Sequence, residues 1–191
     1  LKISLMDYSN QIKVDIENAL AEFIKHKTNK SEDEVVNLSK KFLSQLDEKL
    51  SNKTSTKEIF KHLQEVEHDQ PIYLNGINFV SLCEHHLLPF FGTVDIALYP
   101  QKKIAGISRF DDLVRHLSDN LTLQETLTKN IATEIDEILN PRGVFVRTNA
   151  NHSCSGLLNI GDSFTDVVTT FATGIYEIDH TLRNEALLNF K

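Results

Sequence analysis

Residues 81–92 read SLCEHHLLPFFG, and they place one of the two cysteines of this chain, Cys83, beside two histidines. A second pairing of these residue types follows at 152–154, which read HSC. A thiolate and an imidazole three positions apart can bind the same ion, and a cysteine from a distant segment can supply a third ligand. Three protein ligands leave the fourth position of a tetrahedral zinc ion open for an activated water molecule. The pattern therefore indicates a zinc site.

Two cysteines are also compatible with a disulfide or with inert thiols in the core. The nearby histidines favour metal ligands, because three of the eight histidines, His85, His86 and His152, lie close to a cysteine along the sequence. The other five are scattered among charged or helical segments, where a solvated or capping role is expected. They are His26, His62, His68, His116 and His180.

Composition bounds the class of protein. With 191 residues, 40% hydrophobic and 25% charged, the chain is long enough for a core domain with a helical appendage. The net charge of -7 and the absence of any basic run longer than a pair argue against a nucleic-acid partner. The sequence contains no apolar stretch near the ~20 residues of a membrane span, and its first residues lack the apolar core of a signal peptide. We expect a cytoplasmic protein with reduced thiols and no membrane partner.

The first third of the chain is expected to be helical. In Ser31–Leu50 apolar residues recur every three or four positions, and Ser31 with Glu34 forms a capping-box pattern. A weaker stripe runs through Ile12–Ile24, and a third runs from Thr56 or Lys57 to about Val66. These residues make up an expected N-terminal helical region, 1–69.

After Asp69 the pattern changes to strands and then alternates. Strands are expected at 72–82, around a turn, and at 93–99, followed by helices at 110–117 and 123–139 and by strands at 144–150 and about 166–178. This order predicts an α+β fold, with a second domain at 70–191.

Five motifs in this second domain resemble the GTP cyclohydrolase I family in order and spacing. They are residues 81–92, Gly106-Ile107-Ser108, residues 124–128 (QETLT), residues 140–144 (NPRGV) and His152-Ser153-Cys154. The resemblance covers about residues 70–178 and implies the tunnelling fold, with a four-stranded antiparallel sheet and two helices between its strand pairs. It also implies a barrel formed by several subunits, and hence a ring-shaped homo-oligomer with sites at subunit interfaces.

The resemblance also implies an activity. Members of the family convert GTP to 7,8-dihydroneopterin triphosphate and formate, a step in pterin and tetrahydrofolate biosynthesis. Carried over to this sequence, Cys83, His86 and Cys154 are the zinc ligands. His85 and His152 are the catalytic residues that move protons, His152 near N7 of the purine and His85 during opening of the ribose.

Four more residues correspond to substrate contacts in the family. Glu125 would accept hydrogen bonds from N1 and the exocyclic amino group of guanine, which suits a carboxylate because both groups are donors. Gln124 would hold the edge of the base, Ser108 would lie close to the sugar, and Arg109 would contact phosphate.

Two departures from the family pattern concern the phosphates. Asp112 stands where an arginine is usual, and Leu158 replaces another arginine. Either GTP remains the substrate, with other cations of the same or a neighbouring subunit binding its phosphates, or the chain is a divergent paralogue that acts on a guanine or pterin-like substrate with fewer or no phosphates. The candidate cations are Lys102, Lys103, Arg115, Arg142 and Arg147. A non-catalytic zinc-containing subunit that binds a ligand is the remaining alternative.

Overall fold

The computed structural model describes residues 5–51, 55–158 and 166–190. The chain divides into two compact units, Leu1–Ser51 and Asn52–Lys191. The sequence places the domain boundary later, at residue 69.

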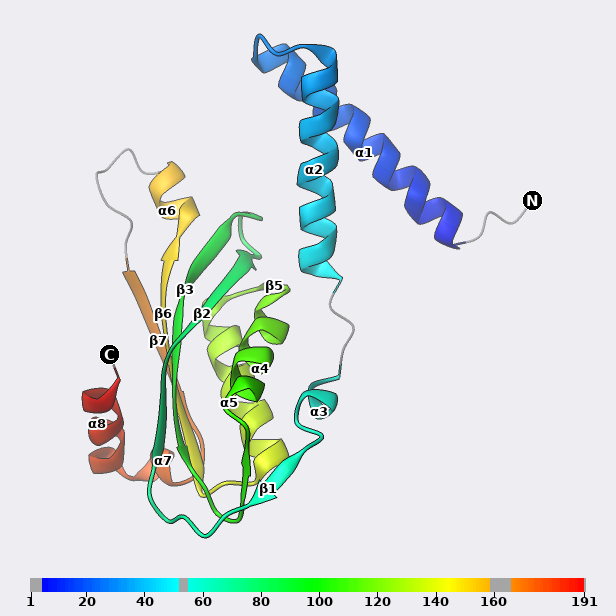
Figure 1. Cartoon of the computed structure of the whole chain (residues 1–191). Coiled ribbons are helices and arrows are strands. Elements are labelled where there is room, and N and C mark those ends of the chain that lie inside the picture. The colour runs from blue at the N-terminus through cyan, green and yellow to red at the C-terminus, as the bar shows by residue number, and fades with distance from the viewer. Residues whose placement is uncertain (1–4, 52–54, 159–165, 191) are drawn as a thin grey trace. The chain divides into compact units, whose positions relative to one another are not determined.

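The first unit is a pair of helices, α1 (Leu5–Lys27) and α2 (Glu32–Leu50), drawn in blue and cyan in Figure 1. Ser31 caps α2 as expected: its side chain accepts from the amide of Glu34, and the Glu34 carboxylate accepts from the amide of Ser31 at 2.9 Å. An ion pair between Lys13 and Asp47 at 3.0 Å joins the two helices. Among the described helices none is long and apolar enough to cross a membrane.

The second unit is built on a five-stranded sheet with the order β5-β2-β3-β6-β7. The bounds are β2 (Ile72–Cys83), β3 (Pro89–Tyr99), β5 (Leu121–Thr122), β6 (Gly143–His152) and β7 (Asp166–Ala172). Strands β2, β3, β6 and β7 pair antiparallel, whereas the two-residue β5 runs parallel to the end of β2. A separate pair joins β1 (Leu63–Glu65) to β4 (Lys103–Ala105). The predicted α+β class is confirmed.

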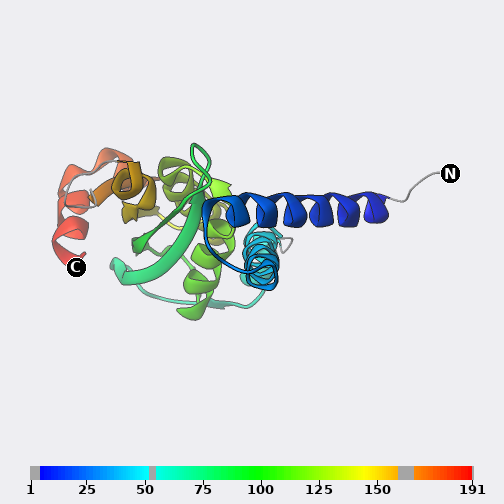
Figure 2. The same ribbon diagram turned by 90° about the horizontal axis from the view of Figure 1, so that it is seen from above.

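Helices cover the two faces of this sheet, as Figures 1 and 2 show. On one face, α4 (Ser108–Ser118) and α5 (Gln124–Leu139) bury the main core, which includes Val94, Ile96 and Ile131. On the other face, α7 (Ile175–Ile178) and α8 (His180–Asn189) enclose a smaller cluster around Phe145 and Tyr176. Successive residues of β3 and β6 point to opposite faces, so one strand contributes to both clusters.

Three local expectations are corrected. The strand expected at about 166–178 ends at Ala172, and Ile175–Ile178 forms the helix α7 instead. The helical pattern of 56–66 gives only one turn, α3 (Thr56–Ile59), because Leu63–Glu65 pairs with β4 and takes up a strand conformation instead. The turn expected within 72–82 is a β-bulge between Leu74 and Ile77. Gly76 permits it with φ 73°, a value that side chains disfavour, and its amide donates to the carboxylate of Asp95 at 2.9 Å.

Candidate functional site

The candidate site forms where four chain segments end or begin at one edge of the second unit. Cys83 is the last residue of β2, and the turn that follows leads directly into β3. Phe90 of β3 pairs with His152, the last residue of β6, and Cys154 follows in the short helix α6 (Ser153–Leu158). Pairing of Cys83 with Thr122 of β5 brings the first turn of α5 to the same place. The pairing register of the strands therefore brings Cys83 and Cys154 to one place, although they lie about 70 positions apart along the sequence.

Two sulfurs and one imidazole lie together here. The ligand atoms of Cys83, His152 and Cys154 are all within 4.8 Å of one another. Both cysteines are free thiols, so a disulfide does not occur in this structure. Cys83 is only 4% exposed and Cys154 is half-buried. A pair of thiols with an imidazole is a donor set that suits zinc.

His85 and His86 lie on the exposed turn between β2 and β3, with their rings 6.0 Å apart. This turn is closed by the amide of Cys83, which donates to the carbonyl of Leu88 at 2.9 Å, and Leu87 takes up φ 57°. Both histidines line the same pocket of about 390 Å³ as the two cysteines. His86, the imidazole expected to bind zinc from the resemblance, is not in the 4.8 Å group, whereas His152 is.

The ring of His152 is held on two sides. It stacks on Phe90 with ring centroids 4.8 Å apart and planes 4° from parallel, and Phe90 is fully buried. Its Nε2 lies 2.8 Å from Oε1 of Gln124. Burial lowers the pKa of His152, and the Glu125 carboxylate opposes this shift because it favours the charged ring.

Gln124 and Glu125 begin α5 and differ in exposure. Gln124 is 2% exposed, and its Nε2 donates to the carbonyls of Thr148 and Val167 at 3.1 and 2.8 Å. Glu125 is exposed and lines the pocket, so its carboxylate is accessible to a ligand. The roles of Phe90 and Val167 were not expected from the sequence, because stacking on a histidine and a carbonyl contact from β7 depend on strand register.

The residues expected to contact the sugar and the phosphates lie elsewhere in the chain. Ser108 and Arg109 begin α4 and are absent from the described lining of the pocket. Asp112 forms ion pairs with Arg109, at 3.1 Å, and with Arg115, so the carboxylate offsets one of the two positive charges. The side chain of Leu158, the other departure, lies outside the described residues.

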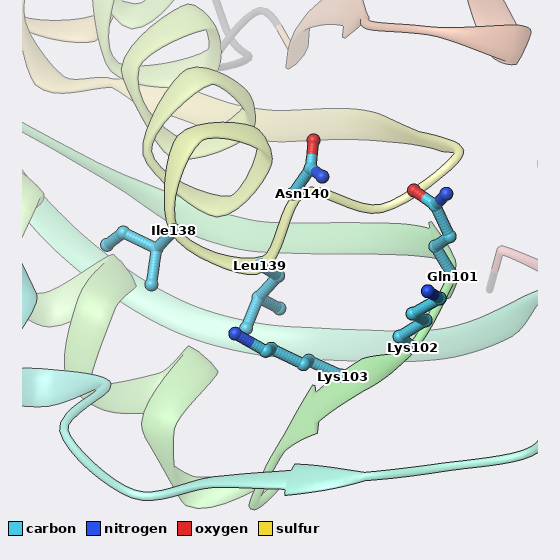
Figure 3. Close-up of a pocket in the computed structure, with 6 residues that line it drawn as sticks. All are labelled: Gln101, Lys102, Lys103, Ile138, Leu139 and Asn140. Atoms are coloured by element: carbon cyan, nitrogen blue, oxygen red, sulfur yellow. The ribbon is translucent and has the colours of Figure 1, made fainter.

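The alternative cations are also separated from the pocket within one chain. Lys102 and Lys103 line a second pocket of about 290 Å³ at the carboxyl end of α5 (Figure 3). That end is about 22 Å from Gln124, since an α-helix rises 1.5 Å per residue. Arg147 is bound to Asp95 at 2.9 and 2.6 Å, and Arg142 stacks over Tyr99 at 5.1 Å.

Comparison of the sequence with known proteins shows which family this chain belongs to. The family model for GTP cyclohydrolase I matches residues 16–191. The chain belongs to the GTP cyclohydrolase I family. The match begins within α1, so the family extends over both compact units.

Relatives within the GTP cyclohydrolase I family include two bacterial proteins named GTP cyclohydrolase 1. That of Streptococcus thermophilus (strain CNRZ 1066) is 40% identical over 121 residues, which cover 63% of this chain and 65% of the relative. That of Fusobacterium nucleatum is 42% identical over 135 residues, covering 71% of this chain and 72% of the relative. Among solved structures, the apo form of an archaeosine synthase QueF-Like aligns with TM-score 0.46 and 18% identity over 56% of this chain and 97% of that chain. A likeness this weak carries no inference about function.

Proposed function

We propose that this chain is a zinc-dependent cyclohydrolase that opens the imidazole ring of a guanine nucleotide, converting GTP to 7,8-dihydroneopterin triphosphate and formate. The observation that carries the proposal is the convergence of Cys83, His152 and Cys154 in a pocket that also contains His85 and Glu125. Family membership supports the same reaction. Water breaks both bonds from C8 to nitrogen, and C8 leaves as formate. The opened ribose then rearranges and condenses with the freed amino group, releasing one water, to close the dihydropterin ring.

The donor set fits zinc. Cys83 and Cys154 would hold the ion through their sulfurs, and we assign the third ligand to His86, three residues after Cys83 on the adjoining turn. His152 is already engaged by Gln124 and Phe90, which suits a group that moves protons in a fixed position. When bound, zinc supplies a Lewis acid that activates water beside the base.

The side chains around the metal ligands have complementary tasks. The carboxylate of Glu125 can accept from two donors at once, which matches N1 and the exocyclic amino group of guanine. His152 would deliver a proton near N7 of the purine, and His85, exposed on the turn, would assist opening of the ribose. Both proton transfers need the guanine ring to be held in one orientation in the pocket, and the carboxylate of Glu125 would hold it there.

A partner copy is needed to complete the site for a charged substrate. The described lining of the pocket contains no lysine or arginine, although a triphosphate requires cations. We infer that Ser108 and Arg109 reach this pocket from a neighbouring chain of a ring-shaped homo-oligomer. In that arrangement each site combines the metal ligands of one copy with the α4 residues of another.

The test is release of formate from GTP by the zinc-loaded protein, together with appearance of the fluorescent dihydropterin product. The Cys154→Ser variant, which lacks one proposed ligand, should lose both signals. A protein that binds zinc stoichiometrically and binds GTP, but releases no formate, would instead be a non-catalytic ligand-binding subunit.

A second candidate is a paralogue whose substrate carries fewer or no phosphates. The specific observation in its favour is the pairing of Asp112 with both Arg109 and Arg115, which offsets part of the positive charge expected to bind phosphate. Parallel assays with GTP, GMP and guanosine distinguish the two candidates. A strong preference for GTP would exclude the second one.

A further inference from the structure

The side chain of Gln124 is buried, and its contacts are made within the chain. It is 2% exposed, donates from Nε2 to the carbonyls of Thr148 and Val167, and places Oε1 2.8 Å from Nε2 of His152. The two carbonyls belong to β6 and β7, so this one amide ties the start of α5 to two strands. Both N–H donors are therefore used, and neither is left for the edge of a base.

These contacts fix which end of the amide faces the histidine. If the oxygen and the nitrogen of the Gln124 amide were exchanged, the amide oxygen would face the carbonyl oxygens of Thr148 and Val167, and neither carbonyl can donate a hydrogen bond. Oε1 must therefore point to His152, and since an amide oxygen only accepts, Nε2 of the ring must carry a hydrogen. In a neutral ring the other nitrogen, Nδ1, is then the free acceptor.

The stacking contact restricts the same ring independently. Phe90 lies parallel to it at 4.8 Å, and the backbone of Phe90 pairs with that of His152 in the sheet. A rotation that turned Nε2 away from Gln124 would lose the hydrogen bond and leave a buried amide oxygen without a partner, which is unfavourable. Orientation and tautomer are thus set together.

We infer that Gln124 is a positioning residue that holds His152 as its Nε2–H tautomer, so that Nδ1 is the ring nitrogen that exchanges a proton with the substrate. The consequence for turnover rests on the proposed function, whereas the tautomer itself does not. Gln124 therefore acts through His152 and does not contact the guanine base through its N–H groups.

The tautomer can be read directly by long-range ¹H–¹⁵N correlation spectra of the zinc-loaded protein with labelled histidine, recorded at alkaline pH where the rings are neutral. The His152 signals are assigned by their loss in His152→Asn. We expect a single pattern with the hydrogen on Nε2. A wild-type ring with the hydrogen on Nδ1, or an equal mixture of tautomers, would overturn the inference without any variant at position 124.

The variant arm compares Gln124→Met with Thr128→Val. Thr128 lies one turn further along α5 and is 1% exposed; its hydroxyl bonds to Thr148, to Thr169 and to the backbone carbonyl of Gln124. Its loss therefore disturbs the same buried region but removes none of the side-chain amide contacts of Gln124 and none of the contacts of His152. Gln124→Met should give mixed tautomers and lower kcat at least about 100-fold with little change in KM, as expected for a displaced acid or base. Thr128→Val should keep the wild-type spectrum and kcat.

The outcomes separate this inference from the proposed function. Wild-type spectra with Nε2–H in a protein that releases no formate would leave the positioning role intact and reject the activity. An active protein in which Gln124→Met raises KM at unchanged kcat and keeps a single tautomer would make Gln124 a substrate contact and reject the positioning role.

Discussion

Replacing Asp112 by Asn should tighten the binding of phosphate-bearing substrates. The Asp112 carboxylate pairs with Arg109 at 3.1 Å and with Arg115, so the three side chains carry a combined charge of +1. The amide of Asn has nearly the same shape but no charge. The variant therefore releases Arg109, the residue we assign to the phosphates, and raises the local charge to +2.

The magnitude follows from the two competing partners. The side chains of Arg109 and Asp112 are 44% and 30% exposed, and ion pairs this accessible contribute about 0–1 kcal/mol each because water screens them. A hydrogen bond from a free guanidinium to a phosphate contributes about 1.5–3 kcal/mol. The net gain is about 0.5–3 kcal/mol, which corresponds to a roughly 2- to 150-fold lower KM or Kd for GTP. Guanosine, which lacks phosphate, should be unaffected.

The assay compares KM for GTP and for guanosine in the wild type, Asp112→Asn and Asp111→Asn. Asp111 lies in the same turn of α4, and Asp111→Asn removes the same formal charge as Asp112→Asn. It serves as the control because the ion pair described for Arg109 involves Asp112 and not Asp111. The ratio of the two KM values should change in Asp112→Asn alone, and the change should shrink at high salt. Equal ratios in the two variants would refute the argument that Asp112 competes with phosphate for Arg109.

Three further predictions concern the metal, the assembly and the core. His86→Asn should reduce zinc content measured by elemental analysis far more than His152→Asn does, and the opposite order would make His152 the third ligand. Cys154→Ser chains should be inactive, and Arg109→Ala chains should have a raised KM for GTP. Mixing the two should give about a quarter of the sites the wild-type KM, if each site draws on two neighbouring copies of a closed ring; the absence of any such sites after verified subunit exchange would contradict shared sites. Asp95→Ala should lower the free energy of unfolding, measured by urea denaturation, by about 3 kcal/mol, because it leaves the largely buried guanidinium of Arg147 without its carboxylate partner. A loss below about 1 kcal/mol would show that solvent replaces the ion pair.

Much of the local structure could be predicted from the sequence where one local signal was decisive. The Ser31–Glu34 capping box begins α2, and the apolar spacing of 123–139 predicts α5, which ends at Leu139 and is followed by the C-cap residue Asn140 with φ 46°. The segment 57–66 shows the limit of this approach. Its apolar spacing suits a helix, but pairing with β4 is a long-range contact that spacing does not report.

The candidate site could likewise be predicted only in part. Cys83, His152 and Cys154 were predicted as functional residues, and their side chains lie together in the structure. The contacts of Gln124 could not be predicted, because they depend on carbonyl groups of β6 and β7 that register alone brings to the start of α5. The pairs of Asp112 follow from its spacing of three residues from Arg109 and Arg115 on one helix, a signal that the sequence does contain.

Zinc X-ray absorption of the purified protein can show whether two sulfurs from distant segments bind one zinc ion. We expect about one zinc per chain, with two sulfur ligands at about 2.3 Å and the remaining ligands nitrogen or oxygen at about 2.0–2.1 Å. A chain without bound zinc, or zinc with only nitrogen and oxygen neighbours, would contradict this expectation.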